Sequence, residues 1–136
     1  MIQFASVTLE DARRILTAGE ARATEIGVPC NIAVVDAGAH LVAHIRMDGS
    51  QLGSITHAID KAFTSCAYRR TTEALGRDGQ PAGPLHGVAN THQGRVVIFA
   101  GGIPLVHEGQ VVGAIGVSGG TIEEDRTVAE AAVAAF

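Results

Sequence analysis

Apolar residues recur at helical spacing in three stretches of the chain, which predicts helices over residues 8–27, 54–75 and 121–136. Thr8 and Thr121 stand at the starts of the first and third stretches, each with an acidic residue three positions later. A hydroxyl followed by a carboxylate at that spacing is the pattern that caps the first turn of a helix. The pattern therefore predicts where two of the three helices begin.

Between the first two helices, two β-rich runs at 31–35 and 40–47 flank the turn-forming residues 36–39, which predicts an antiparallel hairpin. Successive side chains of a strand point to opposite faces of the sheet. One face of the second run is therefore expected to carry His40, Val42, His44 and Arg46, and the other Leu41, Ala43, Ile45 and Met47.

Three further runs, 95–102, 103–107 and 110–118, read as strands, the last two joined by a turn at 108–109. The predicted order is helix, two strands, helix, three strands, helix. Strands joined mostly by hairpins, with helices interspersed, favour a single α+β domain over residues 1–136. We expect a five-stranded antiparallel sheet with helices on both faces.

Residues 76–94 connect the second helix to the third predicted strand. The stretch is rich in glycine and contains two prolines, and Gly76 is expected to end the preceding helix. A connection of this length inside a compact domain is usually a lid, a binding loop or a mobile segment.

The composition and charge of the chain argue against nucleic-acid binding, a membrane-spanning segment and secretion. The chain carries 46% hydrophobic residues and a net charge of −4, with no basic cluster beyond Arg69-Arg70, so nucleic acid is not an expected partner. No apolar run approaches the roughly 18 residues of a membrane span, and the first residues lack the pattern of a signal peptide. Cys30 and Cys66 form no metal-binding spacing, which favours a cytoplasmic protein with two free thiols, and Cys66 is expected to be a small core residue.

Arg46, Asp48 and Lys61 form the first candidate site. Arg46 and Asp48 stand at the end of a predicted strand, and Lys61 lies two turns into the next helix. An arginine can hold a carboxylate with two hydrogen bonds, and a nearby lysine adds a point charge. We expect the three groups to converge on a hollow where the sheet meets the helix. The alternative is an ion pair of Asp48 with Arg46 or Lys61 that only joins strand to helix.

His40 and His44 do not form a metal site if their segment is a strand. At about 3.3 Å per residue they stand roughly 13 Å apart, too far for one metal ion to bridge. Their face is therefore either a partly solvated sheet surface or the wall of a ligand site.

The remaining candidates lie on the second helix and on loops. His57 stands one turn before Lys61, and the default for that helix stripe is a solvated polar face. His86 and His92 in the long connection could reach a haem or a metal, or could be ordinary loop residues. Gly101 and Gly102 are positions where a ligand could approach the backbone closely.

Four stretches together resemble the GlcG/HbpS family, which also includes the C-terminal domain of PduO-type corrinoid adenosyltransferases. They are "LVAHIRMDGS", "SITHAIDKAFTSC", "FAGGIPLVHEGQVVGAIGVSGG" and the acidic start of the last helix. The resemblance implies a profilin-like three-layer α/β/α fold with a five-stranded antiparallel sheet, and a homo-oligomer. Some members are described as haem-binding, and others accompany glycolate, diol or aromatic catabolism. The chain departs from the family at His44, where an aromatic residue is common, and at Ser50, where a small apolar residue is common.

The leading expectation is a small-ligand-binding protein whose ligand is haem or a related tetrapyrrole. Arg46 and Lys61 would anchor its carboxylates, and His86 or His92 would approach the iron. Asp48, His57, Gly101 and Gly102 complete the expected ligand-binding set, with no separate metal site.

Two alternatives remain open. The first is a cofactor-independent enzyme acting on a small carboxylated or oxygenated metabolite, with His44, Asp48 and Lys61 as its acid–base groups. The second is a structural or assembly module that binds no ligand.

Overall fold

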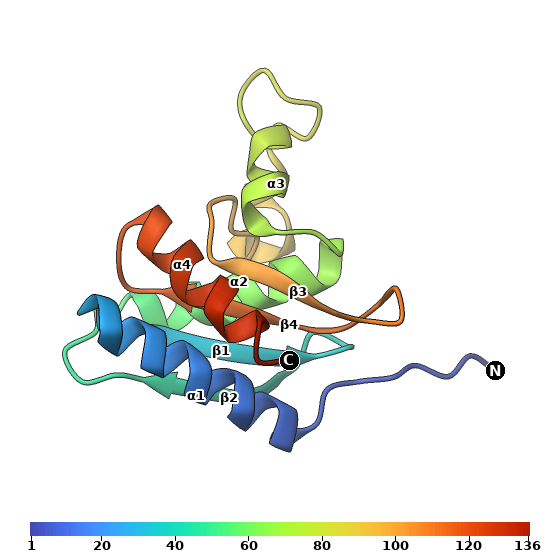
Figure 1. The fold of residues 1–136 in the computed structure, drawn as a ribbon. Helices are drawn as coiled ribbons and strands as arrows, with labels where there is room; N and C mark the ends of the chain where they lie inside the picture. Colours follow the sequence, from blue (N-terminus) through green and yellow to red (C-terminus); the bar gives the residue numbers. More distant parts are fainter.

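A four-stranded antiparallel sheet lies between two layers of helices in the computed structural model, which describes residues 1–136 (Figure 1). The strands lie in the order β2-β1-β4-β3, where β1 is Asn31–Asp36, β2 is Leu41–Arg46, β3 is Gly102–His107 and β4 is Gln110–Ser118. One face is covered by α1 (Leu9–Ile26) and α4 (Ile122–Val133), and the other by α2 (Ser54–Tyr68). The short helix α3 (Thr72–Asp78) projects away from the sheet.

The two faces of the sheet bury different kinds of side chains. Ile32, Val34, Ile115 and Val117 face α1 and α4 and form the larger core with residues such as Ile15, Leu16 and Val128. The face toward α2 carries Ala33, Val35 and Ala114, and α2 packs its own small residues Ala58, Ala62 and Cys66 against them. Gly116 belongs to this second face, and a Cβ there would overlap the carbonyl oxygen of Ala58. Small side chains thus let α2 approach the sheet closely.

The predicted helix starts are confirmed. Thr8 and Thr121 each accept a hydrogen bond from a backbone amide three residues on, and Asp11 and Glu124 return the bond to the cap residue's own amide. Four otherwise unpaired amide groups are thereby satisfied, which fixes both helix starts.

The hairpin at 31–47 is confirmed, with a local change of register. His44 and Arg46 lie opposite Ala33 and Asn31, so they share the sheet face that α2 covers. A register shift between Val34 and Val35 displaces Val42, which packs instead against the larger core. The polar face of β2 therefore begins at His44.

The expected five-stranded sheet is wrong: residues 95–101 are not a strand. This segment runs along α2, where the hydroxyl of Thr64 accepts a hydrogen bond from the amide of Val97 at 3.0 Å and donates to the carbonyl of Arg95 at 3.3 Å. Its backbone groups find partners on a helix side chain, so the β-rich sequence does not need a neighbouring strand.

The helix expected over 54–75 is two helices. Arg69 adopts a left-handed conformation with φ 56° and ends α2, and Thr71 then caps α3 with its hydroxyl. Gly76 lies inside α3 and does not end it. A Cβ there would overlap the carbonyl oxygen of Ile98, so glycine is needed for close packing against the 95–101 segment.

After α3 the chain forms a loop that extends from the rest of the molecule and returns through two short 3₁₀ turns, Val88–Asn90 and His92–Gly94 (Figure 1). A small apolar cluster of Leu75, Val88 and Val96 holds the base of this projection together. The long connection is thus a folded extension with its own core.

Residues 1–8 form an extended arm that leaves the molecule beside the β3–β4 hairpin (Figure 1). The amide of Val7 donates to the carbonyl of Val112 at 2.9 Å, and the hydroxyl of Ser6 accepts from the amide of Ala37 at 3.0 Å. Before these two anchors, the side chains of Met1, Ile2 and Phe4 are exposed.

Both cysteines are free and buried, as expected for Cys66. Burial raises the pKa of the Cys30 thiol to about 11 and raises the pKa of the Cys66 thiol as well. Each thiol donates to a backbone carbonyl at 3.3 Å, Cys30 to Val28 and Cys66 to Asp36. These contacts make the two cysteines packing residues.

Candidate functional site

Lys61 is the central charged residue of the structure. Its side chain is fully buried, and its Nζ donates to the carbonyl of Val117 at 2.8 Å and to Oδ2 of Asp125 at 2.9 Å. The ring centroid of Phe99 lies 5.0 Å from the same nitrogen. Because Lys61 belongs to α2 and Asp125 belongs to α4, this ion pair links two helices that cover opposite faces of the sheet.

The glycine pair at 101–102 makes room for this lysine. A Cβ on Gly101 would lie 2.8 Å from Lys61 Nζ, and one on Gly102 would lie 2.5 Å from the Lys61 carbonyl oxygen. We expected the space beside these glycines to admit a ligand. In the structure the lysine itself fills it.

Burial dominates the electrostatics of the pair. Removal from water lowers the pKa of Lys61 and raises the pKa of Asp125, and the attraction between the two charges opposes both shifts. Oδ1 of Asp125 also accepts from the amide of Gly120 at 2.9 Å, so both oxygens of the carboxylate have a partner. A buried pair with such complete hydrogen bonding is a structural link whose loss on one side is costly.

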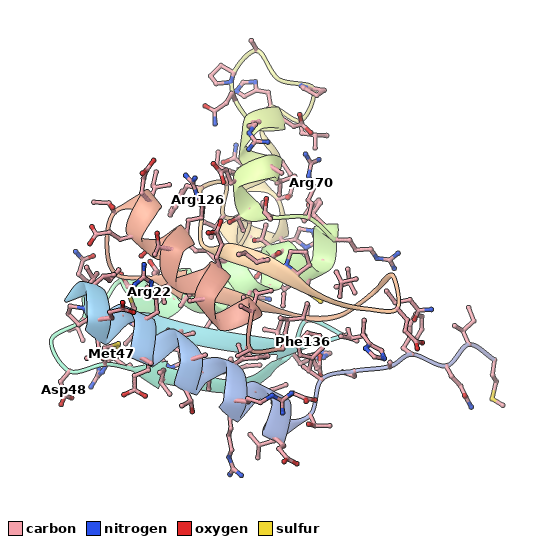
Figure 2. All side chains as sticks on the ribbon, viewed as in Figure 1. Arg22, Met47, Asp48, Arg70, Arg126 and Phe136 are labelled. Atoms are coloured by element: carbon pink, nitrogen blue, oxygen red, sulfur yellow. The ribbon has the colours of Figure 1, made fainter.

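Arg46 and Asp48 do not join Lys61. Both side chains are exposed, at the end of β2 and in the turn that follows it, and neither forms an ion pair. Figure 2 shows Asp48 on the outer edge of the molecule, far from the projecting loop that contains His86. The expected common hollow of Arg46, Asp48 and Lys61 is therefore absent, and so is the expected alternative of an ion pair through Asp48.

Sequence reasoning missed Asp125 as the partner of Lys61. A lysine on a helix between Ala58 and Ala62, both of them core residues, was the available signal, because a charge placed in an apolar stripe needs a partner. The acidic start of the last helix offered three candidates, Glu123, Glu124 and Asp125, and only the fold selects Asp125.

The segment 91–99 covers the polar stripe of α2 around Lys61 and Thr64, which are both buried, whereas His57 at the start of the stripe stays exposed, as expected for a solvated face. His57 packs edge-on against Phe99 with ring centroids 6.1 Å apart. Thr64 bonds to the backbone of Arg95 and Val97, as described above, and the hydroxyl groups of Tyr68 and Thr91 lie 3.5 Å apart.

Four residues in the C-terminal half of α2 and at the 3₁₀ turn His92–Gly94 form what we call the aromatic cluster: Phe63, Tyr68, His92 and Arg95. The ring of His92 stands edge-on to Phe63 at 5.5 Å and to Tyr68 at 6.1 Å. The Arg95 guanidinium lies 3.8 Å from the centre of the Phe63 ring and donates to Oδ1 of Asp60 at 3.0 Å. His86 takes no part in the cluster, because it belongs to the outer loop.

His44 is the remaining candidate with an unusual environment. It is half-buried, and its Nε2 is buried with no hydrogen-bond partner. Burial, with a smaller contribution from the positive charge of Arg46, lowers the pKa of His44. The imidazole is thus held in its neutral form near neutral pH.

Two cavities, of about 390 and 520 Å³, lie along the N-terminal arm, and none of the predicted site residues lines either of them. No group of three or more acidic, histidine or cysteine side chains is placed to hold a metal ion. No helix is long and apolar enough to span a lipid bilayer.

The fold and the buried ion pair define the class of this protein. It is an α+β domain in which a lysine of one helical layer and an aspartate of the other form an ion pair near the end of the antiparallel sheet. Residues 7–134 match the model of the family described as haem degrading protein HbpS-like. The chain belongs to this HbpS-like family, as the sequence resemblance predicted.

Three relatives show how close the match is. An uncharacterized 15.0 kDa protein from the dhaT-dhaS intergenic region of Citrobacter freundii is 42% identical over 134 residues, or 98% of this chain and 94% of the relative. The crystal structure of Klebsiella pneumoniae protein ORFY matches 100% of this chain and 94% of its own with a TM-score of 0.98 at 37% identity. The crystal structure of a PduOC:heme complex matches 97% of this chain and 96% of its own with a TM-score of 0.93 at 33% identity.

Proposed function

We propose that this chain binds haem or a related tetrapyrrole. The observation that carries the proposal is the similarity to the PduOC:heme complex over 97% of the chain at 33% identity. The description of the matched family, a haem degrading protein, supports the same ligand.

The aromatic cluster is the part of the surface that suits such a ligand best. A surface haem site needs an imidazole for the iron, apolar or aromatic surface against the porphyrin, and a cation for the propionates. His92 is exposed, its imidazole makes no hydrogen bond, and the ring stands beside Phe63 and Tyr68. Arg95 has 42% of its side chain exposed and is steadied by Asp60. When bound, haem would supply an iron able to change oxidation state or take a further small ligand.

Of the two loop histidines, the proposal selects His92 as the axial ligand. His86 belongs to the loop after α3, and its ring forms no contact with the rings of the aromatic cluster. Arg95 replaces Lys61 as the proposed propionate anchor, because the Lys61 ammonium is enclosed and already paired. Arg46 lies at the other end of the molecule from the projecting loop and stays a separate candidate.

Hemin titration of the purified protein tests this proposal. We expect a saturable shift of the Soret band for the wild type and for His86→Ala, and a displaced band or an affinity at least about tenfold weaker for His92→Ala, because one iron–imidazole bond is lost. Transfer of the bound hemin to apomyoglobin would separate specific binding from adsorption.

Two results would contradict it. A wild-type protein without a saturable Soret shift would reject haem as the ligand. A shift that survives His92→Ala and disappears in His86→Ala would reject the aromatic cluster while leaving haem binding in place.

His44 supports a second candidate function, acid–base catalysis on a small carboxylated metabolite. Its imidazole is neutral, and although Nε2 is enclosed, Nδ1 is not buried and has no hydrogen-bond partner. Arg46, two residues along the same strand face, is exposed without an ion-pair partner. A neutral histidine beside an unpaired arginine suits proton removal from a bound carboxylate substrate. Lys61 has no part in this candidate, because its Nζ is enclosed.

The variant His44→Gln gives a pH-dependent prediction. Because the folded state lowers the pKa of His44 below the usual 6.5, the unfolded chain takes up a proton at higher pH than the native protein does. The contribution of His44 to stability is therefore complete above about pH 6.5 and is lost as the pH falls through the folded pKa. We expect the difference in urea midpoint between wild type and His44→Gln to shrink on acidification from pH 8 to pH 5.

A difference that does not change with pH would contradict this expectation. The same variant tests the catalytic candidate in a screen of small hydroxy and keto acids. Turnover that His44→Gln leaves unchanged would reject His44 as the acid–base group.

A further inference from the structure

We propose that the smaller cavity, of about 390 Å³, is a second binding site, for a small amphipathic molecule with a carboxylate at one end and an apolar body. The cavity lies where the N-terminal arm, the start of α1, the β3–β4 hairpin and the end of the chain meet. It shares no residue with the aromatic cluster or with the polar face of β2, so the proposal does not rest on the proposed function.

The apolar part of the wall comes from four elements. Val7 of the arm and Val112 of β4 are buried beneath the cavity, while Val106 of β3 and the ring of Phe136 are partly exposed at its border. Phe136 lies near the point where the arm reaches the sheet (Figure 2). A volume of this size, lined by both apolar and polar side chains, is typical of a site for a small organic ligand.

Polar groups from α1 and β3 also line the cavity. Arg14 lines it, with Nε donating to the carbonyl of Ala135 at 3.1 Å and Nη2 donating to Oδ1 of Asp11 at 2.9 Å. These two bonds fix the guanidinium and leave its other three N–H groups without a partner in the protein. The imidazole of His107 makes no hydrogen bond and adds a second donor or acceptor at the wall.

Asp11 does not compete for these donors. Its Oδ2 accepts from the amide and the hydroxyl of Thr8, both at 2.8 Å, in the cap of α1. These bonds and the neighbouring Arg14 lower the pKa of Asp11, so the carboxylate stays charged and keeps the guanidinium in place. A carboxylate ligand is the group that a fixed arginine with free parallel N–H bonds recognises best.

The arm forms the outer wall through Ala5, Ser6 and Val7. It is anchored at Ser6 and Val7 by the two hydrogen bonds described above, whereas Ala5 is exposed. A bulky side chain at Ala5 can therefore occupy the cavity without disturbing the buried core, which gives a blocking variant that does not depend on Arg14.

Octanoate is the probe, and calorimetry with ligand-observed NMR is the measurement. We expect saturable binding of octanoate to the wild type, about tenfold weaker or more for Arg14→Gln because a charge-assisted bond is lost, and no measurable binding to Ala5→Phe. Arg13→Gln is the matched control, because Arg13 is exposed on α1 and does not line the cavity. Its affinity should equal that of the wild type, and octanamide, which lacks the charge, should bind at least about tenfold more weakly than octanoate.

The proposal is overturned if octanoate shows no saturable binding to the wild type. It is equally overturned if all four proteins bind octanoate alike, or if octanamide binds as tightly as octanoate. Circular dichroism of each variant shows whether a lost signal comes from the cavity or from the fold, and Ala5→Phe keeps the test decisive if Arg14→Gln unfolds.

Discussion

Asp125→Ala is expected to lower the free energy of unfolding by about 3–5 kcal/mol, because it leaves the Lys61 ammonium buried without its counter-charge. Lys61 has no route to water in the native fold, so it must either stay charged at high cost or lose its proton. Urea denaturation followed by circular dichroism would measure the loss as a lower midpoint at an unchanged slope.

The double variant Lys61→Met/Asp125→Leu is the informative control. Removing both charges avoids an unpaired buried group, so we expect it to recover a large part of the stability lost by Asp125→Ala. Asp48→Ala, on an exposed carboxylate with no ion pair, should change stability by less than about 0.5 kcal/mol. An Asp125→Ala protein as stable as Asp48→Ala would show that the ion pair does not hold the helices together.

Gly116→Ala is expected to cost about 2–3 kcal/mol, an unusually large effect for one added methyl group. The new Cβ would overlap the carbonyl oxygen of Ala58 and lie 2.5 Å from the amide nitrogen of Ala62, so the backbone of α2 would have to move away from β4. A side chain could rotate to relieve such a contact, but these backbone atoms cannot.

Gly53→Ala is the matched control for Gly116→Ala, because it adds the same methyl group where there is free space. Gly53 precedes α2 with φ −60°, and a Cβ there would meet no atom within 4 Å. Gly53→Ala should therefore be neutral or stabilise the protein by roughly 0.4–1 kcal/mol, since alanine restricts the unfolded chain. Equal thermal midpoints for the two variants would contradict the close packing of α2 on the sheet.

Short sequence patterns correctly predicted those elements of the fold that depend only on hydrogen bonds and turns between neighbouring residues. The caps at Thr8 and Thr121 and the hairpin after Cys30 depend on neighbouring residues, and the structure contains all three. The family, too, was recognisable from the spacing of glycines and charges along the chain, and the match over residues 7–134 confirms it.

The wrong predictions share one physical cause: the structure there depends on contacts between residues that are far apart in the sequence. Residues 95–101 have the composition of a strand, but Thr64, about thirty residues earlier, provides the hydrogen-bond partners that hold them against a helix. Lys61 and Asp125 are separated by 64 positions, and no local pattern indicates that their charges meet.

The candidate site was only partly accessible from sequence. Reasoning from the residues identified His92 and His44 as candidates, but the rings around His92 and the unpartnered nitrogen of His44 are visible only in the folded chain. Arg14 and His107 were not singled out, because a cavity wall assembled from four separate elements leaves no periodic signal.

The environment of the two cysteines has a practical consequence for spectroscopy. The Cys30 thiol is enclosed and Cys66 is nearly so, and the pKa of both thiols is raised. Very little thiolate is therefore present at neutral pH, and maleimide reagents should react only slowly with the native residues. A single cysteine introduced at Leu85, on the exposed loop, would then carry a fluorophore at one defined place without any prior removal of native sulfur.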